Sequence, residues 1–140
     1  MTTRSAINLS MNKCLGLVAA IGILLAGCSS RSQFPWSLEG KTIPTFEIAT
    51  KEEVSAANPI SFSLAVVVST SLSKDELTTV SQKIIEDLPK HNLVVIFFFS
   101  DRKQVSGEYT VGKAWWGVND DKNFPPPGDY SHHTLIVERK

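Results

Sequence analysis

Hydrophobic residues divide the chain into an apolar N-terminal run and a longer part built of short apolar segments. Residues 14–26 contain no charged side chain and are soon followed by Cys28 and two serines. From residue 45 onward, apolar residues first alternate with polar ones, then repeat every three or four positions, then return to strand-like runs. Alternation is typical of strands and the longer repeat of a helix. The pattern predicts a leader followed by one small domain.

Two strands are expected in the first half of the domain. Residues 45–54 begin with an alternation of Phe46 and Ile48 with polar residues. Residues 60–70 place large apolar side chains on one face and smaller, mixed side chains on the other. The large set is Phe62, Leu64, Val66 and Val68. Such a strand belongs to a sheet with one well-buried face.

A helix is expected next, and then a central strand. Ser73 and Glu76 have the spacing of a capping box. An apolar stripe follows at Leu77, Val80, Ile84 and Leu88, and Pro89 ends the helix. The run "LVVIFFF" at 93–99 comes directly afterwards. A strand, helix and strand joined by short links predict a right-handed crossover between two parallel strands.

Residues 108–118 and 130–139 are predicted to be further strands, separated by a loop with three prolines. The predicted fold class is therefore α+β. It has a mixed four- to five-stranded sheet with one helix packed on one face, in the order β-β-α-β-β-β.

This architecture leaves one face of the sheet without a cover. The strand at 93–99 is apolar on both sides, whereas one helix covers only one of them. Curvature of the sheet, the segment after Cys28, the chain's own loops and tryptophans, or another protein could cover the second side. Adjacent strand residues face opposite ways, so one tryptophan of the Trp115–Trp116 pair is expected in the core and the other exposed. The candidate interaction residues are Phe97, Phe99, Trp115 and Trp116.

The leader has the features of a bacterial export signal. Arg4 and Lys13 precede thirteen apolar or small residues, too few to cross a bilayer as a permanent helix. The sequence Leu25-Ala26-Gly27-Cys28 resembles a bacterial lipobox. The resemblance implies cleavage before Cys28, a diacylglyceryl thioether on Cys28 and an anchor that holds the protein at a membrane. An ordinary secretory signal or a short membrane anchor with a chance cysteine is the alternative.

The predicted organisation has three parts. Residues 1–27 are the signal peptide, with Met11 as an alternative start; residues 28–44 are the lipidated cysteine and a tether; residues 45–140 are the domain. Phe34 and Trp36 are expected either at the lipid interface or against the domain. Ser29 stands where an aspartate would favour the inner membrane. A position in the outer membrane facing the periplasm is therefore favoured for a Gram-negative cell.

Charge and cysteine content exclude several classes of function. The formal net charge is zero, and removal of Arg4 and Lys13 makes it −2, so nucleic acid is not an expected partner. Cys14 leaves with the signal and Cys28 carries lipid. The mature chain then has no thiol for a disulfide or a thiolate metal site. No cofactor is expected.

One cluster could carry catalysis or bind a metal. His132 and His133 lie near Asp129, with Asp120 and Asp121 in the preceding loop. Adjacent histidines on a strand point to opposite faces, so they cannot both ligate one ion without leaving regular strand geometry, and a metal needs three or four ligands. The chain also has no G-x-S-x-G motif and no Gly-rich phosphate loop. The predicted function is thus a non-enzymatic binding or interaction role in the cell envelope with an unknown partner, for which an envelope protein is one candidate; a plain structural or decoy lipoprotein is a further class. The alternative is a small metal- or His/Asp-dependent periplasmic hydrolase.

The run "GEYTVGKAWWGVNDD", together with "DELTTVSQKIIEDL" and "VVIFFFSD", resembles a family of small bacterial domains of unknown function. The family pattern has an "LSKEEL"-type helix, an apolar strand ending in "FFYDD", and "YTVGKA". The resemblance spans about residues 45–118 and is carried by 73–77, 97–101 and 109–114. The tryptophan pair and "VNDDKNF" depart from the pattern. The resemblance implies a fold unit and supplies no mechanism.

Overall fold

A computed structural model describes residues 33–54, 59–119 and 124–140. The predicted signal peptide, Cys28, Asp120 and Asp121 lie outside the described residues. The elements in chain order are β1 (Phe46–Glu53), β2 (Ser61–Val68), α1 (Lys74–Asp87), β3 (Leu93–Phe99), the 3-10 turn η1 (Arg102–Gln104), β4 (Gly112–Gly117) and β5 (Thr134–Arg139).

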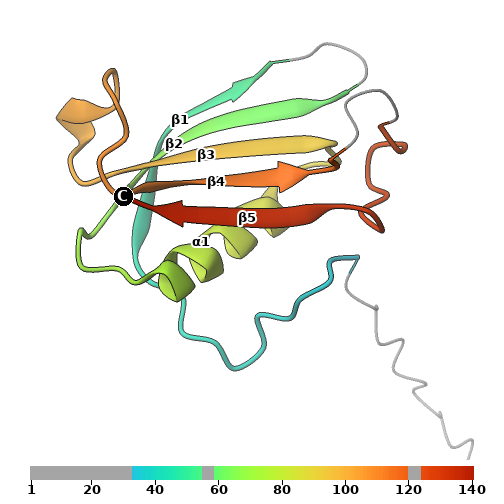
Figure 1. Cartoon of the computed structure of the whole chain (residues 1–140), viewed down its shortest axis with the longest axis horizontal. Helices are drawn as coiled ribbons and strands as arrows, with labels where there is room; N and C mark the ends of the chain where they lie inside the picture. The colour runs from blue at the N-terminus through green and yellow to red at the C-terminus, as the bar shows by residue number, and fades with distance from the viewer. Residues whose placement is uncertain (1–32, 55–58, 120–123) are drawn as a thin grey trace, which may run out of the picture. The chain divides into compact units, whose positions relative to one another are not determined.

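The strands form one five-stranded sheet in the order β1-β2-β3-β4-β5, as Figure 1 shows. Strands β2 and β3 are parallel and are joined through α1, whereas the other three neighbouring pairs are antiparallel. The sequence-based prediction of an α+β fold with a mixed sheet and one helix is therefore confirmed.

Helix α1 begins at the predicted cap. The Ser73 hydroxyl accepts a hydrogen bond from the Glu76 backbone N–H at 3.2 Å, and the Glu76 carboxylate accepts one from the Ser73 backbone N–H at 2.7 Å. This reciprocal pair satisfies two of the donors that a helix start leaves open. The helix ends at Asp87, and its C-cap Leu88 has extended backbone, as is usual for a residue that precedes a proline.

The hydrophobic core lies between α1 and one face of the sheet. The residues predicted for that face of β2 are all buried, as are Leu77, Val80 and Ile84 of the helix stripe. Leu88 is partly buried against this core. Strands β3, β4 and β5 add alternate residues to the same face, namely Val94, Ile96, Phe98, Ala114, Trp116 and Val137. The two-residue period thus places one row of β2, of β3 and of β4 in the core, to which β5 adds Val137.

Strands β4 and β5 are shorter than the sequence predicts. Strand β4 begins at Gly112 because the N–H groups of Thr110 and Val111 both donate to the Phe98 carbonyl, which interrupts regular pairing. Gly112 itself lies so close to β5 that a Cβ atom there would meet the Glu138 carbonyl oxygen at 2.4 Å. A side chain at this position would force the two strands apart.

Residues 130–133 form a turn before β5, and not the start of the strand. The His133 N–H donates to the Tyr130 carbonyl at 3.1 Å, and the Asp129 carboxylate accepts a hydrogen bond from the Ser131 N–H. A short aspartate side chain that bonds two residues ahead favours a turn over a strand. Histidines 132 and 133 therefore do not lie on regular strand geometry, although one is exposed and the other buried.

The segment before β1 packs along the helix side of the domain, where it runs below α1 in Figure 1. The Trp36 Nε1–H group donates to the Glu86 carboxylate of α1 at 2.9 Å. The Trp36 ring meets that of Trp116 edge-on at 4.8 Å, and the Phe34 ring stacks on that of Tyr130 at 4.7 Å. Of the two positions expected for Phe34 and Trp36, the structure shows packing against the domain.

Among the described residues, no helix is long and apolar enough to cross a membrane.

Candidate functional site

The side of the sheet that faces away from α1, here called the open face, is only partly covered. Its central residues Val95, Phe97 and Trp115 are half-buried, and Ile136 on β5 is 45 % exposed. These side chains belong to the same row, because Trp115 pairs with Val95 on one side and with Ile136 on the other. The open face therefore presents a continuous apolar strip across β3, β4 and β5.

A hollow of about 390 Å³ lies on this strip. Its lining residues are Val95, Phe97, Lys113, Ala114, Trp115, Ile136 and Glu138. Binding sites for small groups or partner side chains are commonly apolar hollows with a few polar groups at the edge. This hollow has that composition.

Lys113 and Glu138 supply the polar groups. The Lys113 ammonium lies 3.0 Å from the Glu138 carboxylate, and this contact raises the pKa of Lys113. Both side chains are about half exposed, so the pair contributes little to folding stability. Its value for binding is that it offers both a cation and an anion beside an apolar surface.

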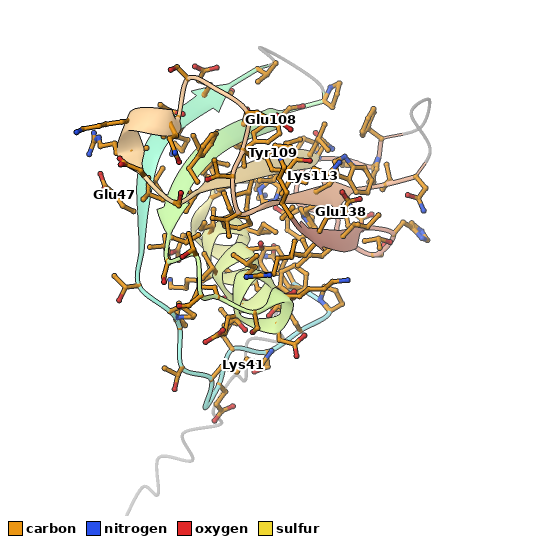
Figure 2. The ribbon with its side chains drawn as sticks, turned by 60° about the vertical axis from the view of Figure 1, so that its left-hand side comes forward. Lys41, Glu47, Glu108, Tyr109, Lys113 and Glu138 are labelled. Atoms are coloured by element: carbon orange, nitrogen blue, oxygen red, sulfur yellow. The ribbon has the colours of Figure 1, made fainter. Side chains whose placement is uncertain are left out.

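The chain's own loop covers the other half of the open face. The segment between β3 and β4 folds back so that the ring of Tyr109 lies 5.9 Å from that of Phe97. The Lys140 ammonium lies 5.3 Å from the centre of the Tyr109 ring and 2.7 Å from the Glu108 carboxylate, and the latter contact lowers the pKa of Glu108. Figure 2 shows Glu108, Tyr109, Lys113 and Glu138 near one another and Lys41 well apart from them.

A second hollow of about 240 Å³ lies under this loop. It shares Phe97 with the first hollow, and residues of β1, β2 and the loop complete its lining, including Glu52, Val105 and Tyr109. Of the covers considered for this face, the loop is the one observed, and it leaves the part around Trp115 and Ile136 accessible. The segment after Cys28 does not supply the cover where it is described, because Phe34 and Trp36 pack on the helix side.

The four predicted interaction residues have different positions. Phe97 and Trp115 line the larger hollow. Phe99 is only 3 % exposed and lines the smaller hollow beneath the loop, whereas Trp116 is fully buried in the helix-side core. The expectation that one tryptophan is buried and the other accessible is confirmed.

Sequence reasoning missed Lys113, Ile136 and Glu138 as parts of the hollow. Strand parity could have found them, because Lys113 is two residues from Trp115, and Ile136 and Glu138 share a strand face. The cross-strand register was needed to show that these rows meet. Tyr109 has the same parity as Lys113 and Trp115 in the predicted strand 108–118, but in the structure it belongs to the loop before β4.

A second notable site is a buried cluster of aromatic and histidine rings at the end of the sheet where β3 begins. The Trp116 ring lies 5.0 Å from the His133 ring and 5.9 Å from the Tyr130 ring, and Tyr130 lies 5.0 Å from His91. His91 is fully buried and His133 is 8 % exposed. No sequence motif singled out His91, which stands directly before the apolar β3 run.

Each histidine of this cluster has one ring nitrogen bonded and one without a partner among the described residues. His91 Nδ1 donates to the Pro89 carbonyl at 2.7 Å, and His133 Nε2 donates to the Asn92 carbonyl at 2.7 Å. The second ring nitrogen of each, with the indole nitrogen of Trp116, is buried without a hydrogen bond. Burial lowers the pKa of both His91 and His133, because a protonated ring would be poorly solvated there.

The described residues of the hydrolase alternative lie within electrostatic range of one another, because the pKa of Asp129, lowered mainly by hydrogen bonds from Ser131, is also lowered by His132 and His133, but each has its own environment. His132 is exposed, His133 is held by Asn92, and the Asp129 carboxylate accepts hydrogen bonds from Ser131, which lower its pKa. Within residues 33–54, 59–119 and 124–140, no group of three His, Cys, Asp or Glu side chains is placed to hold a metal ion. Asp120 and Asp121 lie outside these residues.

Comparison of the chain with known protein families, with curated proteins and with solved structures found no match.

Proposed function

We propose that the chain is a lipid-anchored protein of the bacterial cell envelope whose domain binds another envelope protein without catalysing a reaction. The observation that carries the binding role is the accessible apolar hollow on the open face, with Trp115 and Ile136 in its lining. Tryptophan is among the residues that contribute most to protein interfaces. The Lys113–Glu138 pair at the same hollow adds a means of orienting a partner.

The proposed localisation at the membrane rests on the leader and its lipobox-like end. The packing of Phe34 adds a geometric consequence. Only five residues separate Cys28 from Phe34, and this stretch reaches roughly 20 Å when fully extended. If Cys28 carries the lipid, the domain is thus held close to the bilayer, and its partner must also be accessible near a membrane surface.

Crosslinking in intact bacteria tests the binding role. We expect the full-length chain to give a crosslinked product with a second protein, and Trp115→Ala to remove that product, because the substitution deletes the largest apolar side chain of the hollow. Ile48→Ala is the matched control, since Ile48 is 44 % exposed but lies on β1, away from the hollow. Equal yields from Trp115→Ala and the parent chain would refute the proposed site.

Metabolic labelling with palmitate tests the anchor. The parent chain should take up label and sediment with membranes, whereas Cys28→Ser should do neither, because the serine hydroxyl cannot form the thioether. Unchanged labelling of Cys28→Ser would show that the lipid, if present, is attached elsewhere.

A further inference from the structure

The two edge strands of the sheet differ in how they are protected. Strand β1 has a register shift between Ile48 and Thr50, and it carries the charged residues Glu47, Lys51, Glu52 and Glu53. A bulge and charges are the usual means by which an edge strand avoids pairing with another chain. Strand β1 is therefore a protected edge.

Strand β5 has no bulge, and its charged residues, Glu138 and Arg139, lie at its C-terminal end. Its six residues pair with β4 in one unbroken register, and its centre is Leu135-Ile136-Val137. It contains no proline and no bulge, and Ile136 is 45 % exposed. A regular, apolar edge of this kind is suited to pair with a further strand.

The hydrogen bonds between β4 and β5 show which backbone groups remain available. The Lys140 N–H donates to the Val111 carbonyl, so the backbone N–H of Lys140 points toward the β4 side, although the Val111 N–H donates to Phe98 and not back to Lys140. Alternation then directs the backbone groups of Glu138 and Ile136 toward β4, and those of Leu135 and Val137 toward the outside. The N–H groups of Leu135 and Val137 donate to no described residue.

We propose that β5 pairs antiparallel with β5 of a second copy of this chain, with Ile136 opposite Ile136 of that copy. The pairing joins two five-stranded sheets into one sheet of ten strands. The proposal does not depend on the proposed function, because it rests on the β5 edge alone.

The side chains select this register among those that the backbone allows. The outward backbone N–H and C=O groups of one β5 must lie opposite those of the other. The two-fold axis that relates the two copies can therefore pass through Leu135, Ile136 or Val137. An axis at Ile136 places Leu135 opposite Val137 and Thr134 opposite Glu138. Every pair is then apolar with apolar or neutral with charged, and like charges never meet.

The other two registers are less favourable. An axis at Val137 places the Glu138 carboxylate opposite the apolar Ile136 side chain, and Arg139 opposite Leu135. An axis at Leu135 places Val137 opposite His133, which lies in the turn before β5 and not in the strand. The self-complementary register at Ile136 is the reason for a second copy rather than an unrelated protein.

The pairing also extends the open face. Ile136 lines the hollow beside Trp115, so pairing at Ile136 brings the hollows of two copies together across the new junction. A partner that binds the open face would then meet two hollows on one surface.

A cysteine at the axis tests the proposal in the full-length chain. Ile136 and its counterpart form a pair without mutual backbone hydrogen bonds, whose Cα atoms lie about 4.5 Å apart, within the range of a disulfide. We expect Ile136→Cys, oxidised in intact cells, to give a disulfide-linked dimer as its main product. Ile48→Cys is the control, because Ile48 is 44 % exposed on the protected edge. The parent chain controls for Cys14 and Cys28.

Equal dimer yields from Ile136→Cys, Ile48→Cys and the parent would overturn the proposal. A second variant gives a test without oxidation. Ile136→Lys places two ammonium groups opposite each other, and the exposed position should leave the fold intact, as circular dichroism would show. The detergent-extracted parent should have the mass of two chains by light scattering, and Ile136→Lys that of one. A parent of single-chain mass, or an Ile136→Lys variant that stays dimeric, would contradict the pairing.

Discussion

Trp115 and Trp116 differ in their surroundings because adjacent strand residues face opposite sides of the sheet. Trp116 is fully buried against Phe34, Trp36 and Tyr130, whereas Trp115 remains accessible at the hollow. The strand period made this division predictable. The period could not predict which of the two tryptophans is buried, because that depends on the face of the sheet against which α1 packs.

The buried histidines make the stability of the domain depend on pH. The folded state lowers the pKa of His91 and His133 below the ordinary value of 6.5, so the unfolded chain binds protons more readily than the folded one. Stability is then constant above pH 6.5 and falls as the pH drops below 6.5 toward the lowered folded pKa values. The carboxylates Glu76, Glu108 and Asp129, whose pKa values are also lowered, act in a separate window below about pH 4.5.

Urea unfolding at a series of pH values checks this dependence. We expect the parent to lose stability from pH 6.5 downward, and His133→Gln to lose less, because a glutamine amide can still donate to the Asn92 carbonyl but does not titrate. His132→Gln is the control at an exposed neighbour and should behave as the parent. If His133→Gln follows the parent curve throughout, protonation of His133 does not contribute to the acid sensitivity.

At the scale of elements, α1 was the most predictable part of the fold. Its cap, its apolar stripe and its end are all local features of the sequence, and each was confirmed. The first residues of β4 and β5 were predicted about four positions too early in the sequence. The start of β4 is set by a hydrogen bond between residues distant in sequence, Val111 and Phe98. The start of β5 is set by the turn at residues 130–133, which the apolar pattern does not reveal.

The capping box of α1 gives a prediction at this scale. Ser73→Ala should lower the free energy of unfolding by about 1 kcal/mol, because the Glu76 N–H then loses its acceptor at the helix start. Ser71→Ala is a control on the same exposed loop, since its side chain bonds only to Ser69. Chemical unfolding measures both variants, and equal stability of Ser73→Ala and Ser71→Ala would show that the cap does not stabilise the domain.

At the scale of the whole molecule, the segment before β1 is part of the packed structure. Phe34 and Trp36 cover the rings of Tyr130 and Trp116 on the helix side, and Trp36 also binds α1 through Glu86. A segment that reads as a tether by composition thus closes one side of the core. This packing is also what shortens the remaining link to Cys28.

Substitution of Trp36 tests the role of this segment. Trp36→Ala should destabilise the domain by about 2–3 kcal/mol, because a half-buried aromatic ring leaves the core and Trp116 becomes exposed. Trp36→Phe retains most of the ring contacts and loses only the hydrogen bond to Glu86, so its effect should be about 1 kcal/mol. A Trp36→Ala variant as stable as the parent in urea would mean that the segment is a simple tether.

The sequence by itself determined the α+β class, the parallel β2–β3 pair joined through α1, and the apolar character of β3 on both sides. These follow from local periodicity, capping and chain connection, which act between near neighbours. Only the tertiary structure decided that Phe34 and Trp36 close the core, that His91 and His133 are buried beside Trp116, and that Lys113, Trp115 and Ile136 meet at one hollow. These features depend on the cross-strand register and on contacts between distant segments, which no local pattern of hydrophobic and polar residues specifies.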